Sequence, residues 1–292
     1  MMKDSLGALG ESARDLFRNW RGLLVLAGLY AALLACVYYF FATGVATAWQ
    51  LFVSAATAAA AAPLLLLLEA GAANAALPGA TARGVARGAA RDLPKVLLLA
   101  IPLAALAALF VYLLGKLPEW LPAAAEAPRA VVSATGDERP APLVWQEALT
   151  TTLWLVLLGF VVPLTAAHLW LSAAREGLGR TLKSFHRVVG RAFAARSVFV
   201  YALGLFFFAL TPYFVIYTRT SVTTGWAELL LFGLRLALAF ALTLVGWVVT
   251  LGALARVTPP LAASPAADAP ADAPADAPPP AGAASAEPRL QA

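Results

Sequence analysis

The chain of 292 residues is 61% apolar and only 13% charged, with a mean hydropathy of +0.78. Soluble domains are about 45–50% apolar and about 25% charged, so this composition excludes an ordinary soluble fold and indicates a membrane protein of several spans. The formal net charge of +5 does not indicate nucleic-acid binding, because the basic residues flank apolar runs rather than forming a nucleic-acid-reading module.

Six apolar runs follow one another along the chain, and each is long enough to cross a bilayer. Backbone groups in hydrocarbon need internal partners, so the runs are predicted to be helices of an all-α bundle. The predicted spans are residues 23–43, 49–68, 96–114, 149–171, 198–217 and 229–255. Before them, residues 1–22 have the apolar spacing of an interfacial amphipathic helix. After them, residues 258–292 are mostly Pro, Ala, Asp and Ser, which predicts a disordered tail.

The loop between the third and fourth predicted spans, residues 116–147, is mildly acidic and rich in proline. Trp120 and Trp145 stand near its two ends, where interfacial tryptophans anchor spans. Residues 130–133 are predicted to form a short strand beside a Gly-Asp turn.

Two connections between spans carry basic residues about one helical turn apart. The first contains Arg83, Arg87 and Arg91, and the second contains Arg180, Lys183, Arg187 and Arg191. On a helix, the second set falls opposite the apolar side chains Leu182, Phe185, Val189 and Phe193. A helix with these two faces lies in the headgroup zone with its cations near lipid phosphates. We therefore predict that both segments are amphipathic helices that bind anionic membrane lipids.

The two basic segments also align with each other at an offset of one hundred positions, which pairs Pro63 with Pro163 and Thr81 with Thr181. The run 13–16, Ala-Arg-Asp-Leu, repeats at 90–93 and adds a partial third copy. Internal duplication explains this pattern, and so does chance similarity among Ala/Leu-rich spans. Both interpretations stay open.

Basic residues are distributed unevenly over the ends of the spans. The amino terminus has four, the connection from the second to the third span four, that from the fourth to the fifth six, and the carboxyl terminus two. The alternate connections have none, three and one. By the positive-inside tendency, both termini face the cytoplasm. We expect a multi-pass protein of the bacterial cytoplasmic (inner) membrane.

Polar residues near the predicted cytoplasmic ends of the second and fourth spans are candidates for a binding pocket. If the two copies superpose, the pocket would contain Glu69, Asn74, His168, Ser172 and Arg175. The last three share one helix face at i, i+4 and i+7. The alternative is that these side chains are simply solvated at helix ends.

Arg235 permits two interpretations. If the sixth helix crosses from Trp226, the arginine lies about 13 Å inside and needs a partner. If the crossing starts at Leu236, Arg235 extends to the outer interface.

Four spans contain a proline: Pro63, Pro102, Pro163 and Pro212. Proline bends a helix and leaves a carbonyl unpaired, which opens a cavity in some carriers but is also ordinary in packed membrane helices. The alanine-rich run 55–62 would allow close helix contact, including contact with a second copy of the chain.

Residues for catalysis, metals or cofactors are scarce. Cys36 is the only cysteine, which excludes an intrachain disulfide, and His168 and His186 are too few for a zinc cluster. The sequence has no Walker-type loop, G-x-S-x-G elbow, H-E-x-x-H or dinucleotide-binding glycine motif. We expect no cofactor and no enzyme activity.

Two short motifs lead directly into apolar spans: Ser-Phe-His-Arg at 184–187, and residues 12–20, Ser-Ala-Arg-Asp-Leu-Phe-Arg-Asn-Trp. In these motifs and in topology over about residues 5–255, the chain resembles a loose group of bacterial six-span proteins built from repeated interfacial-helix and hairpin units. That group includes the membrane domain attached to some glycerophosphodiester phosphodiesterases. The resemblance implies the fold but not phosphodiesterase activity, because the catalytic domain has no counterpart here, and it assigns no functional residue.

The sequence favours a non-enzymatic protein whose basic helices bind anionic lipid or a partner membrane protein. The alternative is a permease, or a carrier of lipids or small molecules, with a gated cavity between kinked spans. A third class, an enzyme acting on lipid headgroups, would require Glu69 and His168 to approach each other.

Overall fold

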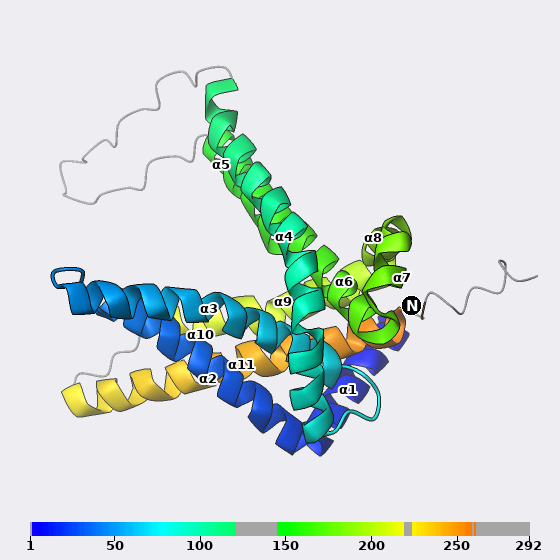
Figure 1. The fold of residues 1–292 in the computed structure, drawn as a ribbon, viewed down its shortest axis with the longest axis horizontal. Coiled ribbons are helices and arrows are strands. Elements are labelled where there is room, and N and C mark those ends of the chain that lie inside the picture. The colour runs from blue at the N-terminus through cyan, green and yellow to red at the C-terminus, as the bar shows by residue number, and fades with distance from the viewer. Residues whose placement is uncertain (1, 121–144, 219–223, 259, 261–292) are drawn as a thin grey trace, which may run out of the picture. The chain divides into compact units, whose positions relative to one another are not determined.

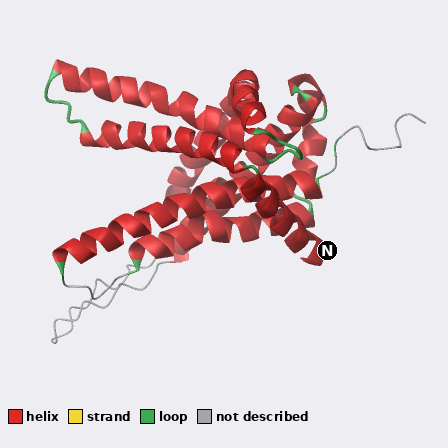
Figure 2. Cartoon of the chain, turned by 90° about the horizontal axis from the view of Figure 1, so that it is seen from below, coloured by secondary structure: helices red, strands yellow, loops and turns green. Residues whose placement is uncertain are grey.

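The computed structural model describes residues 2–120, 145–218, 224–258 and 260. The predicted strand at 130–133 lies outside the described residues, as does the predicted tail apart from Thr258 and Pro260. Every regular element in the described part is a helix, which confirms the all-α prediction (Figure 2).

The helices follow the order of the predicted spans (Figure 1). The first half of the chain contains α1 (Met2–Arg18), α2 (Trp20–Ala42), α3 (Ala48–Ala75) and α4 (Ala82–Trp120). The fourth span is built from α5 (Trp145–Trp154), the π-helix η1 (Leu155–Val161) and α6 (Val162–Glu176). Two short helices come next, α7 (Leu178–Lys183) and α8 (Phe185–Ala192). The fifth span contains α9 (Ala195–Leu205), the π-helix η2 (Phe206–Leu210) and α10 (Thr211–Tyr217), and the sixth is α11 (Gly225–Val257).

Six helical segments of the described part are long and apolar enough to cross a membrane. They are residues 20–42, 48–75, 82–117, 145–176, 195–217 and 225–257, with mean hydropathies between 1.9 and 2.7. Each overlaps one of the predicted spans. The chain is therefore a multi-pass membrane protein with six membrane-crossing helices.

The two basic segments fold differently from each other. The first is continuous with the third span in the 39-residue helix α4, so it does not form a separate surface helix. The second is interrupted at Ser184, whose φ of −109° and ψ of 23° separate α7 from α8. The left-handed glycines also differ, because the offset pairs Gly79 with Gly179 whereas the positive φ of the second connection belongs to Gly177. Residues that the hundred-position offset pairs with each other therefore do not have the same local structure.

Pro163 illustrates how a neighbouring span repairs a helix interrupted by proline. Because proline has no backbone N–H, the usual bond to the Gly159 carbonyl four residues earlier cannot form. The π-helix η1 ends just before this proline, and the hydroxyl of Tyr201 on α9 donates to the Gly159 carbonyl at 3.3 Å. Tyr201 is only 1% exposed, so this bond is shielded from water. Pro63, in contrast, lies within α3 without interrupting it.

The hydrophobic core lies at one end of the spans, which we call the packed end. Here α2, α4 and α9 begin and α3, α6 and α11 finish. Its core includes Leu26, Leu68, Val85, Leu164, Val200 and Leu251. At the other end of the spans, aromatic side chains are exposed, with Phe41 80%, Trp49 70% and Trp226 71% accessible. In a bilayer these apolar surfaces face acyl chains, because lipid tails solvate them as well as protein does.

Small residues bring the helices close together at the packed end. At Gly71 of α3, an added Cβ would lie 2.9 Å from Leu26 on α2 and 3.5 Å from Ala89 on α4. Three helices therefore meet at a position where an added Cβ would force the Leu26 side chain to shift. Such contacts replace the hydrophobic driving force that is missing between helices in lipid.

Replacing Tyr201 with Phe removes the hydroxyl that donates to Gly159 but keeps the ring packing. We expect a loss of about 1 kcal/mol in unfolding free energy, because the partly buried Gly159 carbonyl loses the Tyr201 hydroxyl. Thermal unfolding in detergent measures the effect. Tyr213→Phe is the control, since Tyr213 is 54% exposed. Equal unfolding temperatures for wild type and Tyr201→Phe would show that the Tyr201 hydroxyl does not compensate for the backbone bond that Pro163 removes.

Candidate functional site

The amino-terminal helix α1 packs on α11 through a face of small residues. Its buried residues are Ser5, Ala8, Ser12 and Leu16. The Ser12 hydroxyl donates to the Val249 carbonyl at 3.0 Å, and a Cβ at Gly252 would collide with this hydroxyl. Leu6 and Phe17 of α1, and Trp20 just after it, remain 51%, 61% and 56% exposed. Helix α1 therefore contacts protein on one side and keeps a bulky apolar side uncovered.

Ion pairs hold the same two helices together. Arg256 near the end of α11 contacts Glu11 at 3.1 Å and also pairs with Asp15, both on α1. A further pair links Asp4 of α1 to Arg196 of α9 at 3.9 Å. These pairs are partly exposed, and their main effect is to fix the orientation of α1 rather than to add much stability.

The basic row of α4 points away from the core. Arg83, Arg87 and Arg91 are exposed, whereas Val85 and Ala89 between them are 0% and 2% exposed. The helix packs on α3 through its apolar positions. Its cations are left on the open side, as the helical spacing predicts.

The second basic segment shows the same separation. Val188 and Ala192 are buried where α8 packs on α6. The cations Arg180, Lys183 and Arg187 are exposed, while Arg191 is partly buried. Three large apolar side chains remain uncovered as well: Leu182, Phe185 and Phe193, at 49%, 47% and 43% exposure. This segment therefore presents both cations and bare apolar groups at the surface.

His168 of α6 is the centre of a buried polar cluster. The ring is 3% exposed, with Nδ1 at 3.0 Å from the Leu164 carbonyl. Nε2 lies 3.3 Å from the Ser197 hydroxyl on α9 and 3.4 Å from the Thr258 hydroxyl after α11. If Nδ1 carries the proton and donates to Leu164, Nε2 accepts from the hydroxyls. The cluster joins three segments of the chain.

Arg175, two turns further along α6, caps the carboxyl end of α11. Its guanidinium donates to the Thr258 carbonyl at 3.0 Å and also to the Ala255 carbonyl. The last carbonyls of a helix lack partners within the helix and carry partial negative charge. The Arg175 guanidinium supplies hydrogen-bond donors to these carbonyls and a positive charge opposite their partial negative charge.

Ser172, between these two residues, contacts α7. The hydroxyl of Thr181 donates to the Gly177 carbonyl at 2.9 Å, and its oxygen lies 3.2 Å from the Ser172 hydroxyl. Thr181 is fully buried. The predicted face of His168, Ser172 and Arg175 thus fastens α6 to α7, α9 and α11.

Asn74 and Glu69 belong to two other clusters. The Asn74 amide donates at 3.0 Å to Asp92 of α4, a carboxylate that is 1% exposed and pairs with Lys95 at 2.6 Å and with Arg91 at 3.2 Å. Glu69 accepts a hydrogen bond of 2.9 Å from the indole of Trp247 on α11. The five predicted pocket residues therefore fall into three separate clusters.

Arg235 lies beside the far end of the fifth span. Its guanidinium donates at 2.5 Å to the carbonyl of Thr218, the residue that follows α10. The side chain of Arg235 is partly buried, while its sequence neighbour Leu234 is 65% exposed. The cation is therefore bonded to a helix end, as is that of Arg175.

Chemically, these clusters fix helices in place. No described His, Cys, Asp or Glu side chains gather in a group of three or more that would hold a metal ion. The His168–Ser197 pair has the atoms of a nucleophile and a base, but both side chains are 3% exposed and serve a helix contact. Glu69 and His168 have no hydrogen bond to each other in the described part of the chain.

Comparison with known proteins shows that the chain matches no family model, no curated protein and no solved structure. The resemblance to a phosphodiesterase-associated membrane domain stays a prediction. Functional inference therefore depends on the geometry of the chain itself.

Sequence reasoning missed several polar partners, among them Asp92, Ser197 and Trp247. Asp92 belongs to the repeated Ala-Arg-Asp-Leu run, and an acid among basic residues next to a span was an available signal for a buried pair. Ser197 and Trp247 have no such signal, because their partners are 29 and 178 residues away in the chain.

Replacing Arg175 with Met keeps the length of the side chain but removes the donors to α11. We expect the carboxyl end of α11 to fray, with a loss of about 1.5–3 kcal/mol for hydrogen bonds from a charged group. Hydrogen exchange of residues 253–257 reports the fraying. Arg180→Met, at an exposed position, is the control. Unchanged exchange in Arg175→Met would show that the cap is not needed.

Proposed function

We propose that this protein is a non-enzymatic membrane protein whose packed end binds anionic lipid headgroups. The supporting observation is the surface of α7 and α8. There, the exposed cations Arg180, Lys183 and Arg187 occur in the same short segment as exposed Leu182, Phe185 and Phe193. Acyl chains accept the apolar groups while phosphates attract the cations.

The row of Arg83, Arg87 and Arg91 on α4 adds cations at the packed end. Each Lys or Arg near an anionic membrane surface contributes about 1 kcal/mol of attraction. Six exposed cations on two segments therefore favour anionic over neutral lipid without any single strong contact. A nucleic acid does not explain the bare apolar groups beside the second row.

The excess of basic residues at the packed end supports its placement in the cytoplasm, with both termini on that side of a bacterial inner membrane. This placement puts α1, α7 and α8 at the inner leaflet. A partner membrane protein or a second copy of the chain is the competing use of the same surface, and it would cover Leu182 and Phe185 with protein instead of lipid.

A permease or carrier requires polar side chains that are free to meet a cargo between the spans. His168, Asn74 and Arg235 are instead hydrogen-bonded to neighbouring helices or helix ends. The geometry therefore favours lipid binding over transport.

Neutralising the α7–α8 row tests the proposal in the full-length protein. With spin-labelled lipids, the wild-type protein should restrict the motion of phosphatidylglycerol more than that of phosphatidylcholine. The variant Arg180→Gln/Lys183→Gln/Arg187→Gln should reduce this preference several-fold. High salt should reduce the wild-type preference as well, because exposed charges are screened.

The matched control replaces Leu182, Phe185 and Phe193 with Ala and keeps the charges. This control should weaken the restriction of both spin-labelled lipids by the same amount and keep the preference for phosphatidylglycerol. A wild-type protein that restricts both lipids equally, or a charge variant with unchanged preference, would refute the surface proposal.

A further inference from the structure

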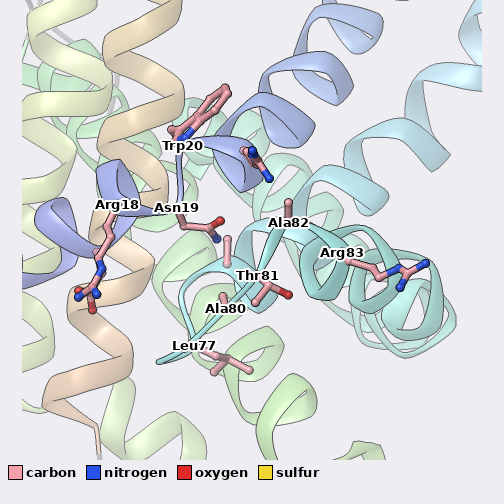
Figure 3. Close-up of a pocket in the computed structure, with 12 residues that line it drawn as sticks. Arg18, Asn19, Trp20, Leu77, Ala80, Thr81, Ala82 and Arg83 are labelled. Atoms are coloured by element: carbon pink, nitrogen blue, oxygen red, sulfur yellow. The ribbon is translucent and has the colours of Figure 1, made fainter.

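A cavity of about 710 Å³ lies where α1 meets α2 and where the α3–α4 connection passes beside them. Three arginines line it: Arg18 at the end of α1, Arg21 at the start of α2, and Arg83 from α4. Figure 3 shows Arg18 on one side and Arg83 on the other, with Asn19 and Thr81 between them. Its volume is in the range of about 300–1,000 Å³ that small-molecule sites occupy.

The charge of this cavity is not compensated from within. Asp15 is the only carboxylate among its lining residues, and Arg256 of α11 binds it from outside the cavity. No carboxylate of the described chain lies within ion-pair distance of Arg18, Arg21 or Arg83. Three exposed arginines therefore line one space without a counterion from the described residues, and in Figure 3 the guanidinium groups of Arg18 and Arg83 are directed away from Asn19 and Thr81.

Hydrogen-bond donors accompany the cations. Asn19 Oδ1 accepts from the Gly22 amide at 3.3 Å, and Thr81 Oγ1 accepts from the Gly84 amide at 3.2 Å. With these acceptors in use, the Asn19 N–H₂ and the Thr81 hydroxyl proton have no acceptor among the described residues. The starts of α2 and α4 add partial positive charge. Every one of these features favours an anion with several acceptor oxygens.

An apolar path leads away from the cavity along α2. Trp20 and Leu24, one turn apart, are 56% and 58% exposed. The Arg21 guanidinium lies over the Trp20 ring at 5.6 Å from its centroid. Tryptophan is common at the headgroup level of membranes, so the arginines stand where phosphates lie and the path stands where acyl chains begin.

We propose that this cavity binds the phosphate group of one phospholipid, with the exposed side chains of Arg18, Arg21 and Arg83 turning toward it as ligands and the acyl chains along Trp20 and Leu24. Arginine forks bind phosphate oxygens in pairs, so two of them can hold one phosphate while the third faces the headgroup. The site deepens the proposed function and rests on its placement of the packed end at the membrane surface, but it predicts one retained lipid rather than a general preference.

Native mass spectrometry of the full-length protein, released from phosphatidylglycerol nanodiscs, counts retained lipids. Wild type should keep one phosphatidylglycerol. The cavity variant Arg18→Gln/Arg21→Gln/Arg83→Gln should keep at least about ten-fold less, since three charge-assisted bonds are lost. The matched control, Lys3→Gln/Arg14→Gln/Lys116→Gln, removes the same charge outside both the cavity and the proposed lipid-binding rows and should keep the lipid.

A second variant, Ala82→Trp, fills the cavity without changing its charge and should also lose the lipid. A second arm adds inorganic phosphate to delipidated protein in detergent and measures the unfolding temperature. Stabilisation by phosphate without lipid retention would overturn the phospholipid assignment in favour of a soluble phosphate ligand. Equal retention by wild type and the cavity variant would overturn the site itself.

The two proposals fail separately. Loss of the spin-label preference with one lipid still retained would refute only the α7–α8 surface. A preference without a retained lipid would refute only the cavity.

Discussion

The contact between Arg175 and the end of α11 holds the packed end together. Helix α11 must finish among other helices, where its last carbonyls meet little water, and a guanidinium from α6 binds two of them. His168 and Ser172 on the same face then fix α9 and α7. Helix α1 packs on the same end of α11 through Ser12 and the Arg256 ion pairs, and Arg18 is its last residue. One helix end thus supports both the basic surface and the cavity.

The coarse architecture was readable from sequence because hydrophobic length is a local property. Six apolar runs predicted six spans, and the rows of cations predicted which sides of α4 and α8 would stay exposed. The break at Ser184 was not predictable, because the two short helices depend on the buried contacts of Thr181 and Val188 rather than on any helix-breaking residue. The sequence did not show that α4 is one continuous helix. Its basic turns have the pattern of a separate surface helix, but their apolar positions continue those of the span along the same helix.

The candidate site was harder to predict than the fold. His168, Ser172 and Arg175 were grouped correctly on one face, since spacing along a helix decides this. Their partners are on other helices, and no pattern in the chain pairs Glu69 with Trp247 or Asn74 with Asp92. The cavity was missed because Arg18 and Arg83 belong to segments 65 residues apart, each of which reads alone as an ordinary membrane-flanking helix.

The two arginines of α11 set its depth in the bilayer. Arg235 and Arg256 are 21 residues apart, which corresponds to about 32 Å along a helix, close to the roughly 30 Å of a hydrocarbon layer. One is bonded near the end of α10 and the other to α1, so neither is free to slide along the membrane normal. In a thicker or thinner bilayer this helix has to tilt or deform the surrounding lipid, which makes the protein sensitive to hydrophobic mismatch.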